Sequence, residues 1–531
     1  MFYLCSMSGL HVVWFRRDLR VHDHAALAAA LASGAPVLPL YIFDPGLWSL
    51  PEQSRRHFDF LIESLTELDE ALRLRGARLV VRTGRTAEVL ADLHRRHGLA
   101  AIHMHEETGL QWAHDRDRSV RRWALQAGVS LREQSQTGVL QDRAGRDSWA
   151  AHWNELMSRP RLKAPDTIRM ADVPSAPWPI AEDFGLGPDD CPERQPGGRA
   201  AGVELLRSFL SGRGRRYGQA LSHPTEAADV SSRLSPHLAF GTVSAREAVQ
   251  AAWRARVAYA EDGDTTFTQS LDGFLARLQA RSRSQQAVED GTSFDKRPVP
   301  PVRDGLRPEA DAGDPRLEAW LQGRTGFPFI DAAMRSLKAT GWLSAPLRVQ
   351  LIGFAAWHLW MDPGRPAAQM AALLTDFEAG IHYPQVQAHV MLTGAATPRV
   401  FNPVKQSQDM DPDGAFIRRW VPELAALPTH YLHAPWEAPK AELVRAGIVF
   451  GQTYPMRMLD HVAAGREARE RLALLRRAPV ITQDRARGEA GQDVRQPDLP
   501  FHGRKRGRTR KAPAMPVQLS FDLLPPAGPA S

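Results

Sequence analysis

The chain is poor in cysteine and has no long apolar run. Cys5 and Cys191 are the only cysteines among 531 residues, so neither a disulfide framework nor a four-thiolate metal cluster can form within the chain. No run approaches the roughly 20 apolar residues of a membrane span. The first ten residues also lack the charged and apolar regions of a secretory signal. These absences predict a cytoplasmic protein with no membrane partner.

The net positive charge is small outside the C-terminal end. The net charge is +7, and residues 504–531 contribute +5 through six Lys or Arg and one acid, Asp522. The rest of the chain therefore carries only +2, and any attraction of this body to nucleic acid must come from a local patch. The basic segment 504–511 has two interpretations, nonspecific phosphate binding or a solvated charge run.

The order of patterns along the chain predicts two domains with a linker and a tail. Residues 11–140 alternate short apolar runs with amphipathic stretches, which favours a parallel sheet with helices on both faces and ligands at the carboxyl ends of the strands. Proline-rich residues 159–199 are typical of a linker, and later residues have helical periodicity. We expect an α/β domain at 8–145, an interdomain linker at 146–200, an all-α domain at 201–476 and a basic, disordered tail at 477–531.

Local signals place individual elements within these domains. The apolar run Val37–Phe43 predicts a buried strand. Pro328 is expected to open one helix, and Pro346 a second that runs through Leu359. Ser244 and Glu247 predict a capping box.

Two groups of residues are candidates for ligand binding. Ser231, Ser232 and Ser235 precede a predicted helix, where unpaired N–H groups and the helix dipole would face an anion such as a pyrophosphate. Plain helix capping is the alternative for these serines. Arg348 and Asp376 lie among apolar residues. Buried charges require a partner, so we expect an ion pair, either alone or beside a ligand.

Histidines are frequent between residues 94 and 114, but their spacing matches no metal-ligand motif. They are His94, His97, His103, His105 and His114, and no cysteine assists them. We therefore predict no metal site and expect these histidines on the surface.

An ordered series of motifs between Trp320 and Pro428 is the most specific signal in the chain. It includes Trp320-Leu-Gln-Gly-Arg-Thr-Gly-Phe-Pro328, Thr340-Gly-Trp342, Phe401-Asn-Pro403 and Asp411-Pro-Asp-Gly-Ala-Phe-Ile-Arg-Arg-Trp. With Trp14-Phe-Arg-Arg-Asp-Leu-Arg20, this series resembles the DNA photolyase/cryptochrome family. The low cysteine count excludes the iron–sulfur branch, and Gln385-Val-Gln387 looks more like a bacterial cryptochrome-like branch.

The resemblance implies a noncovalently bound FAD in the helical domain. The residues at matching cofactor positions are Tyr217, Ser231, Ser232, Leu234, Ser235, Phe274, Arg281, Trp342, Arg348, Asp376, Glu378, Ile381 and His382. His382 matches the position facing the flavin N5, where photolyases usually have Asn, and its ionisation near neutral pH would gate flavin protonation. Relatives also hold an antenna chromophore, a folate or a deazaflavin, in the α/β domain. Glu106 and Glu107 either touch such an antenna or lie in a solvated loop.

Departures from the family pattern bear on DNA repair. Arg277 and Ala280 match positions at which a Glu and a Trp contact the thymine dimer, and Ser344 and Ala345 replace the usual His-Asn. The usual stacking surface for a flipped dimer and the carboxylate that binds it are therefore expected to be missing.

The family's three-tryptophan electron chain is also lost. Val386 and Pro363 occupy two of its positions, and residues 254–319 contain no Trp for the third. Trp357, Trp360 and Tyr383 are candidates for another electron path, unless they serve only in helix packing.

These matches imply a blue-light flavoprotein in which excited reduced FAD donates an electron to a pyrimidine dimer in damaged or single-stranded DNA. A non-repair photoreceptor is the alternative, and a nucleic-acid-binding protein that retains FAD structurally is a third class. Gln518-Leu-Ser-Phe-Asp522 resembles the peptide that docks on the replication sliding clamp, although such short matches also arise by chance.

Overall fold

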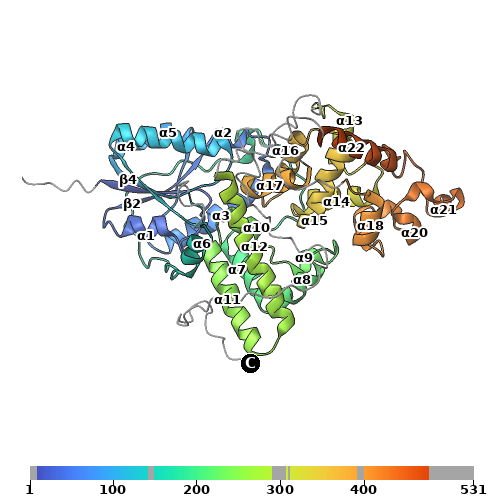
Figure 1. Ribbon diagram of the computed structural model, residues 1–531. Coiled ribbons are helices and arrows are strands. Elements are labelled where there is room, and N and C mark those ends of the chain that lie inside the picture. Colours follow the sequence, from blue (N-terminus) through green and yellow to red (C-terminus); the bar gives the residue numbers. More distant parts are fainter. Residues whose placement is uncertain are drawn as a thin grey trace, which may run out of the picture.

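The computed structural model describes residues 9–140, 149–289, 307–308, 311, 313–390 and 400–476. The N-terminal part of these residues forms a parallel sheet flanked by helices, and the part that follows is largely helical (Figure 1). The expected fold class is therefore confirmed. The basic segment 504–511 and the clamp-like peptide Gln518–Asp522 lie outside the described residues.

The sheet has five strands in the order β3-β2-β1-β4-β5, and every neighbouring pair is parallel. The strands are β1 (Leu10–Phe15), β2 (Val37–Phe43), β3 (Val80–Thr83), β4 (Leu99–His105) and β5 (Ser130–Gln134). Helices α1 (Ala25–Leu31) and α3 (Arg55–Arg73) cover one face, and α4 (Thr86–His97) and α5 (Gln111–Ala127) the other. Because both faces are covered, β2 is buried at every residue. The strand order reverses between β1 and β4, which is where such sheets open a ligand crevice.

The segment expected to be a linker divides into two parts. Its beginning is helix α6 (Trp149–Ser158), whose Trp153, Leu156 and Met157 pack with the helical part of the chain. The rest is mostly irregular and follows the α/β part: Met170 bridges to Val37, and Asp189 forms an ion pair with the buried Arg56 of α3.

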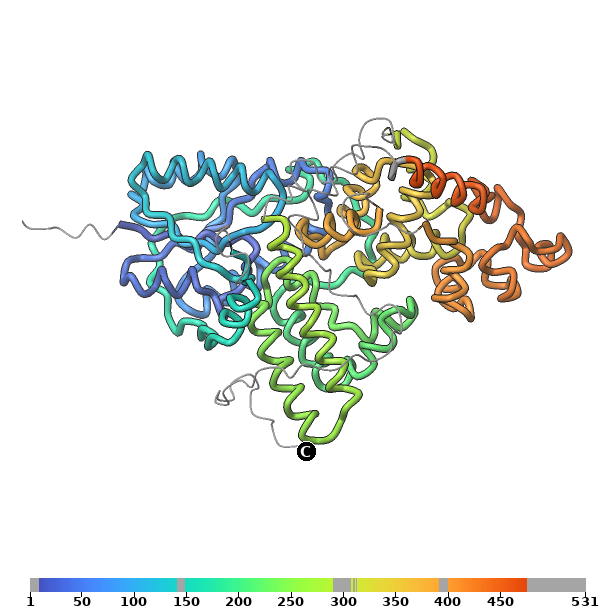
Figure 2. The backbone as a smooth tube through the Cα atoms, in the orientation of Figure 1, coloured from blue at the N-terminus to red at the C-terminus, as the bar shows by residue number. Residues whose placement is uncertain are grey.

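The helical part has two apolar cores. The first includes α7 (Arg199–Leu210) and the long pair α11 (Ala245–Glu261) and α12 (Thr265–Glu289), which projects from the body (Figures 1 and 2). Short helices α8 (Tyr217–Ala220), α9 (Ala227–Val230) and α10 (Ser235–Ala239) lie between α7 and α11 in the sequence. The second core is built from α13 (Pro315–Leu321), α14 (Pro328–Thr340), α15 (Ala345–Gly353), α16 (Gly364–Leu373), α17 (Ala379–Val390), α18 (Pro403–Met410), α19 (Ala415–Trp420), α20 (Thr429–Leu432), α21 (Lys440–Arg445) and α22 (His461–Arg476).

Two local expectations need correction. The helix expected to run from Pro346 through Leu359 changes at Phe354, where α15 gives way to a π-helical turn over Phe354–His358. Ser244 does cap α11 by accepting from the Glu247 N–H, but the Glu247 carboxylate pairs with Arg199 instead of closing a capping box.

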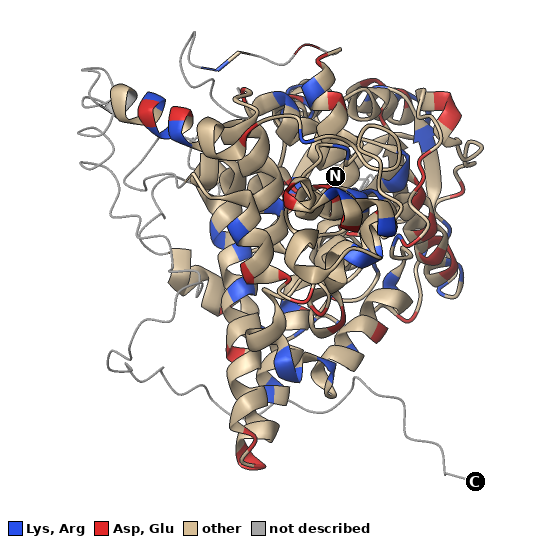
Figure 3. Cartoon of the chain, turned by 90° about the vertical axis from the view of Figure 1, so that its right-hand side faces the viewer, with Lys and Arg blue, Asp and Glu red and all other residues tan. Residues whose placement is uncertain are grey.

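The carboxyl edge of the sheet packs directly on α10 and α11. Gly241 has φ of +68°, and a Cβ there would lie 2.1 Å from the Arg17 carbonyl oxygen, so only glycine fits this approach. Asp23 accepts a hydrogen bond from Ser244 and pairs with Arg246. Lys and Arg are interspersed with Asp and Glu along the described chain (Figure 3). Among the described helices, none has the length and apolar character needed to cross a membrane.

Candidate cofactor site

The ion pair expected between Arg348 and Asp376 is present and buried. Arg348 Nη2 lies 2.7 Å from Asp376 Oδ2, and Arg348 Nε donates to the Leu343 carbonyl oxygen at 2.9 Å. Asp376 Oδ1 is also buried, and it has no hydrogen-bond partner among the described residues. A buried acceptor left unpaired is costly, so the geometry favours an ion pair beside a ligand that donates to Asp376.

His382 presents a second unpaired acceptor. Its Nε2 lies 2.9 Å from the carbonyl oxygen of Ala367, which can only accept, so Nε2 carries the hydrogen and Nδ1 the lone pair. Nδ1 is buried, without a partner in the described part of the chain. Burial lowers the pKa of His382 to about 4. The expectation that this residue ionises near neutral pH is therefore wrong, because His382 remains a neutral acceptor there.

The serine segment lies in a turn between α9 and α10. Arg213 donates to the carbonyl oxygens of Asp229 and Ser232, at 3.0 and 3.4 Å. None of these serine side chains caps α10, because its N-cap is Leu234, which makes no side-chain cap bond. The Ser232 hydroxyl accepts only a long bond, 3.4 Å, from the Leu234 N–H. This observation favours the ligand interpretation of the segment over plain capping.

Arg233 joins the serine segment to the other candidate residues. It has φ of +56°, an uncommon conformation for a residue other than glycine. Its guanidinium lies 4.4 Å from the ring centroid of Trp342. Burial lowers the pKa of Arg233 to about 10, and the Asp376 charge opposes that shift. Sequence reasoning missed Arg233 and Arg213, although Arg233 stands inside the Ser231–Ser235 motif.

Helix α12 supplies the residues expected near cofactor and substrate. The rings of Tyr217 and Phe274 meet edge-on with centroids 6.2 Å apart, and Arg277 lies 5.9 Å from the Tyr217 centroid. One helical turn later, Arg281 forms a two-bond pair with Glu378, at 2.5 and 2.9 Å. Two residues expected at the cofactor, Arg281 and Glu378, are therefore in contact with each other.

The remaining expected residues lie on α12, on α17 and at the start of α15. Ser344 is the N-cap of α15, and its hydroxyl is buried without a partner in the described structure. The Ala345 carbonyl oxygen accepts from Gln385 Nε2 at 3.3 Å. Ala280 on α12 and Ile381 on α17 are partly buried.

The three candidate electron carriers occupy two places. Trp357 and Trp360 lie at the end of the π-helical turn with centroids 6.3 Å apart, and Arg307 is 4.7 Å from the Trp357 centroid. Tyr383 instead packs against His382, with centroids 5.2 Å apart. Tyr383 therefore contacts a residue expected at the flavin.

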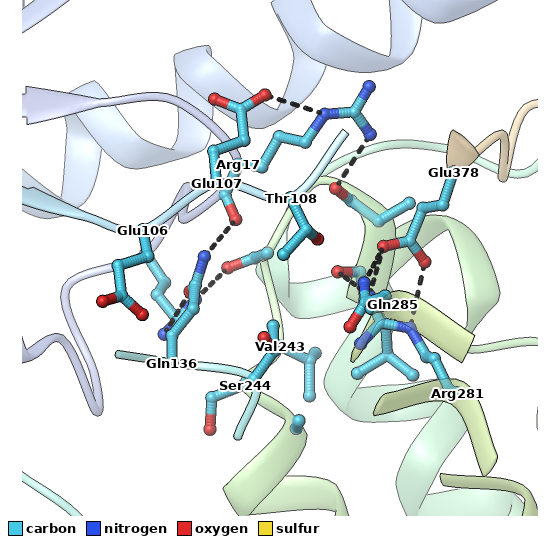
Figure 4. A pocket seen from close by; sticks show the side chains of 16 residues that line it. Arg17, Glu106, Glu107, Thr108, Gln136, Val243, Ser244, Arg281, Gln285 and Glu378 are labelled. Carbon is cyan, nitrogen blue, oxygen red and sulfur yellow. Dashed lines mark hydrogen bonds and ion pairs between the residues drawn. The ribbon is translucent and has the colours of Figure 1, made fainter. Parts of the chain in front are cut away.

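A pocket lies between the carboxyl edge of the sheet and the helical part. Glu106, Glu107 and Arg17 line one side, and Arg281 and Glu378 the other (Figure 4). Burial and the charges of Glu133 and Glu289 raise the pKa of Glu106 to about 7. Glu107 pairs with Arg116 at 2.8 Å. Both glutamates lie in the loop that follows β4 and are partly buried, and Glu107 is paired instead of free in solvent.

A second pocket lies mainly in the α/β part, at the carboxyl ends of β1 and β2, and Phe240 and Phe377 of the helical part complete its lining. Its lining includes Trp14, Trp48, Trp112, Asp44 and Arg116. Such an aromatic lining with a few polar groups suits a planar ligand.

The expectation of surface histidines also fails for His103 and His105, which are buried. His105 Nδ1 and His24 Nε2 lie 2.7 and 3.0 Å from Asp18 Oδ2, so three potential metal ligands converge. The Leu27 N–H donates to His24 Nδ1 at 3.0 Å, which places the imidazole hydrogen on Nε2. His24 Nε2 therefore has no lone pair to offer a metal, and Asp18 Oδ2 already has a hydrogen bond with His105 Nδ1, so the geometry does not favour a metal centre.

Comparison with known proteins agrees with both parts of the structure. Residues 11–143 match the DNA photolyase family model, and residues 274–474 match the model for the FAD binding domain of DNA photolyase. A deoxyribodipyrimidine photo-lyase from Streptomyces griseus is 32% identical over 464 residues, which cover 85% of this chain and 96% of the relative.

Solved structures of both functional kinds are similar. A Synechocystis cryptochrome superposes with a TM-score of 0.76 at 25% identity, covering 87% of this chain and 99% of the other. An archaeal photolyase from Sulfolobus tokodaii, solved with two FAD molecules, gives a TM-score of 0.68 at 25% identity and covers 88% of this chain and 100% of its own.

Proposed function

Because the chain belongs to the DNA photolyase/cryptochrome family of FAD flavoproteins, we propose that it uses blue light to repair pyrimidine dimers in DNA. Bound reduced FAD would supply the chemistry: after it absorbs light it transfers an electron to the dimer. The electron returns to the flavin once the dimer has split. Repair requires bound FAD, and the observation that supports FAD binding here is the pair of buried, unpaired acceptors beside the ion pair, Asp376 Oδ1 and His382 Nδ1.

The side chains have distinct proposed roles toward FAD. Asp376 accepts a hydrogen bond from the flavin, and Arg348 holds the carboxylate in place through the 2.7 Å pair. His382 offers its Nδ1 lone pair and, being neutral, favours a flavin that keeps a hydrogen on the atom facing it. Backbone N–H groups of Ser232, Arg233 and Ser235, in the segment whose carbonyl oxygens Arg213 binds, hold the diphosphate.

The substrate is proposed to be a dimer already freed from base pairing. Arg277 offers a cation beside Tyr217 in place of a carboxylate, and Ala280 offers no ring for stacking. Stacking on an aromatic side chain is worth roughly 1–3 kcal/mol per base. Without it, extrusion from a duplex is poorly compensated, whereas a single strand requires no unpairing.

An antenna chromophore is proposed for the pocket in the α/β part. Trp14, Trp48 and Trp112 supply flat apolar surfaces there, and Arg116 supplies a charge. The archaeal neighbour with two FAD molecules shows that a fold of this kind accommodates a second flavin. We propose a planar ring system of the flavin or deazaflavin type. Reconstitution with FAD in excess should give more than one flavin per chain, and Trp112→Ala should lower the count to one.

The repair proposal is tested by illuminating reduced, FAD-loaded protein with oligonucleotides that contain a cyclobutane thymine dimer. Recovery of thymine absorbance is expected on single strands and should be weak on duplexes. Robust duplex repair would show that the argument from Arg277 and Ala280 is wrong. No repair on either substrate, together with efficient photoreduction, would assign the protein as a photoreceptor, the role that the lost dimer contacts favour.

A further inference from the structure

Tyr383 forms an unusual hydrogen bond across the two parts of the chain. Tyr383 lies on α17, and Glu52 lies between α2 (Pro45–Trp48) and α3. The Tyr383 hydroxyl donates to Glu52 Oε1 at 2.5 Å. Tyr383 is fully buried and Glu52 is 5% exposed. The distance is that of a charge-assisted O–H···O⁻ bond, so a buried phenol faces a buried carboxylate that can take its proton.

The phenol ring contacts side chains of the proposed flavin site and its immediate surroundings. The Tyr383 ring packs on His382 and on Phe377, with centroids 5.2 and 6.1 Å apart. Phe377 directly follows Asp376, whose Oδ1 is one of the unpaired acceptors. Tyr383 therefore contacts His382 directly and the sequence neighbour of Asp376, and His382 and Asp376 are the two residues that would contact the flavin.

The competing tryptophans are in an unfavourable environment for losing an electron. Arg307 lies 4.7 Å from the Trp357 centroid and 5.9 Å from that of Trp360, and Arg471 lies 4.5 Å from Trp360. Burial lowers the pKa of Arg307 only to about 10, against an opposing effect of Asp362, so the guanidinium is charged at neutral pH. A cation stabilises the neutral ring and repels the positive charge that oxidation would create.

We propose that Tyr383 is an electron donor in flavin photoreduction and that Glu52 accepts its proton, an inference that rests on the proposed function. The oxidant is the light-excited, oxidised flavin, which gains one electron. Tyr383 loses that electron as its O–H bond breaks, and the proton passes to Glu52 Oε1. The protein products are a neutral tyrosyl radical and a neutral carboxylic acid. Because the proton leaves with the electron, no unpaired positive charge remains on the buried ring.

The test compares flavin-loaded wild type with Tyr383→Phe, Glu52→Gln and the control Tyr431→Phe, a partly buried tyrosine on α20. Three signals are recorded: the EPR spectrum of the light-induced radical, the infrared band of a newly protonated carboxyl group, and the photoreduction rate in D₂O against H₂O. FAD content and the unfolding midpoint in the dark show whether each variant is intact. These dark measurements would register a purely structural role of the hydrogen bond, whereas radical identity and the isotope effect would not.

Wild type and Tyr431→Phe should give a tyrosyl radical, a carboxyl band and a slower rate in D₂O. Tyr383→Phe should lose all three, and Glu52→Gln should lose the band and the isotope effect. A tryptophanyl radical in wild type, or a tyrosyl radical that survives Tyr383→Phe, overturns this inference and leaves the proposed function standing. A wild-type protein that cannot bind FAD overturns the proposed function and this inference with it.

Discussion

Replacing Arg348 with Met should expose how strongly the cofactor site depends on one ion pair. The side chains of Arg348 and Asp376 are 11% and 3% exposed, so the substitution leaves an unpaired carboxylate out of contact with water. Removing one partner of such a buried pair typically costs about 3–5 kcal/mol. The hydrogen bond to the Leu343 carbonyl oxygen is lost as well, and we expect a loss at the upper end of that range.

A second variant separates the charge from the geometry. Arg348→Met combined with Asp376→Asn removes the unpaired charge and leaves a neutral buried amide, whose unmet hydrogen bonds cost about 1–3 kcal/mol. The double variant should therefore be more stable than Arg348→Met, although neither should retain FAD. Arg256→Met is the control, because the Arg256–Asp272 pair has side chains 40% and 49% exposed. Such exposed pairs contribute about 0–1 kcal/mol.

The assay is denaturant unfolding of FAD-free protein, with bound flavin measured separately by absorbance. FAD-free protein is required because loss of a bound cofactor lowers apparent stability by mass action. The reasoning would be refuted if Arg348→Met unfolded within about 1 kcal/mol of wild type and still bound FAD with unchanged affinity. It would also be refuted if the double variant were the less stable of the two.

Three further outcomes are expected. The buried histidines His57, His105, His237, His358 and His382 have their pKa lowered to about 4. The unfolded chain, with a histidine pKa of about 6.5, therefore binds protons first, and stability should fall between about pH 6.5 and pH 4 by up to about 1.4 kcal/mol per pH unit for each histidine. Denaturant midpoints measured across that range check this, and His382→Asn should reduce the slope by one histidine's share. Removing residues 500–531 deletes six Lys or Arg from the tail. The slope of log DNA affinity against log salt concentration should then become shallower by up to about 5, with FAD content unchanged. An identical slope would mean that the tail is only a solvated charge run. The double variant Arg277→Glu, Ala280→Trp should bind the dimer more tightly by roughly 1–3 kcal/mol, because stacking is restored. A titration with dimer-containing duplex measures this affinity. An unchanged affinity would count against the placement of these residues.

Local patterns were sufficient for the class of fold and for the general nature of the site. The run Val37–Phe43 is a buried strand because a parallel strand covered on both faces must be apolar throughout. Pro328 begins α14 because its missing N–H costs nothing in the first turn of a helix. Arg348 and Asp376 pair because two charges among apolar residues require a partner. Each of these conclusions depends on neighbours in sequence or on a rule that holds in any fold.

Tertiary structure decided the properties that depend on which distant groups meet. His105 is buried because the β1–α1 turn brings Asp18 to it, and His382 is neutral because the Ala367 carbonyl oxygen and a dry environment surround it. Arg233 reaches Trp342 only through a left-handed backbone turn. Tyr383 and Glu52 are 331 residues apart in the sequence and 2.5 Å apart in the fold. No periodicity or spacing along the chain encodes these approaches, because desolvation and hydrogen bonding depend on the full three-dimensional surroundings of a group.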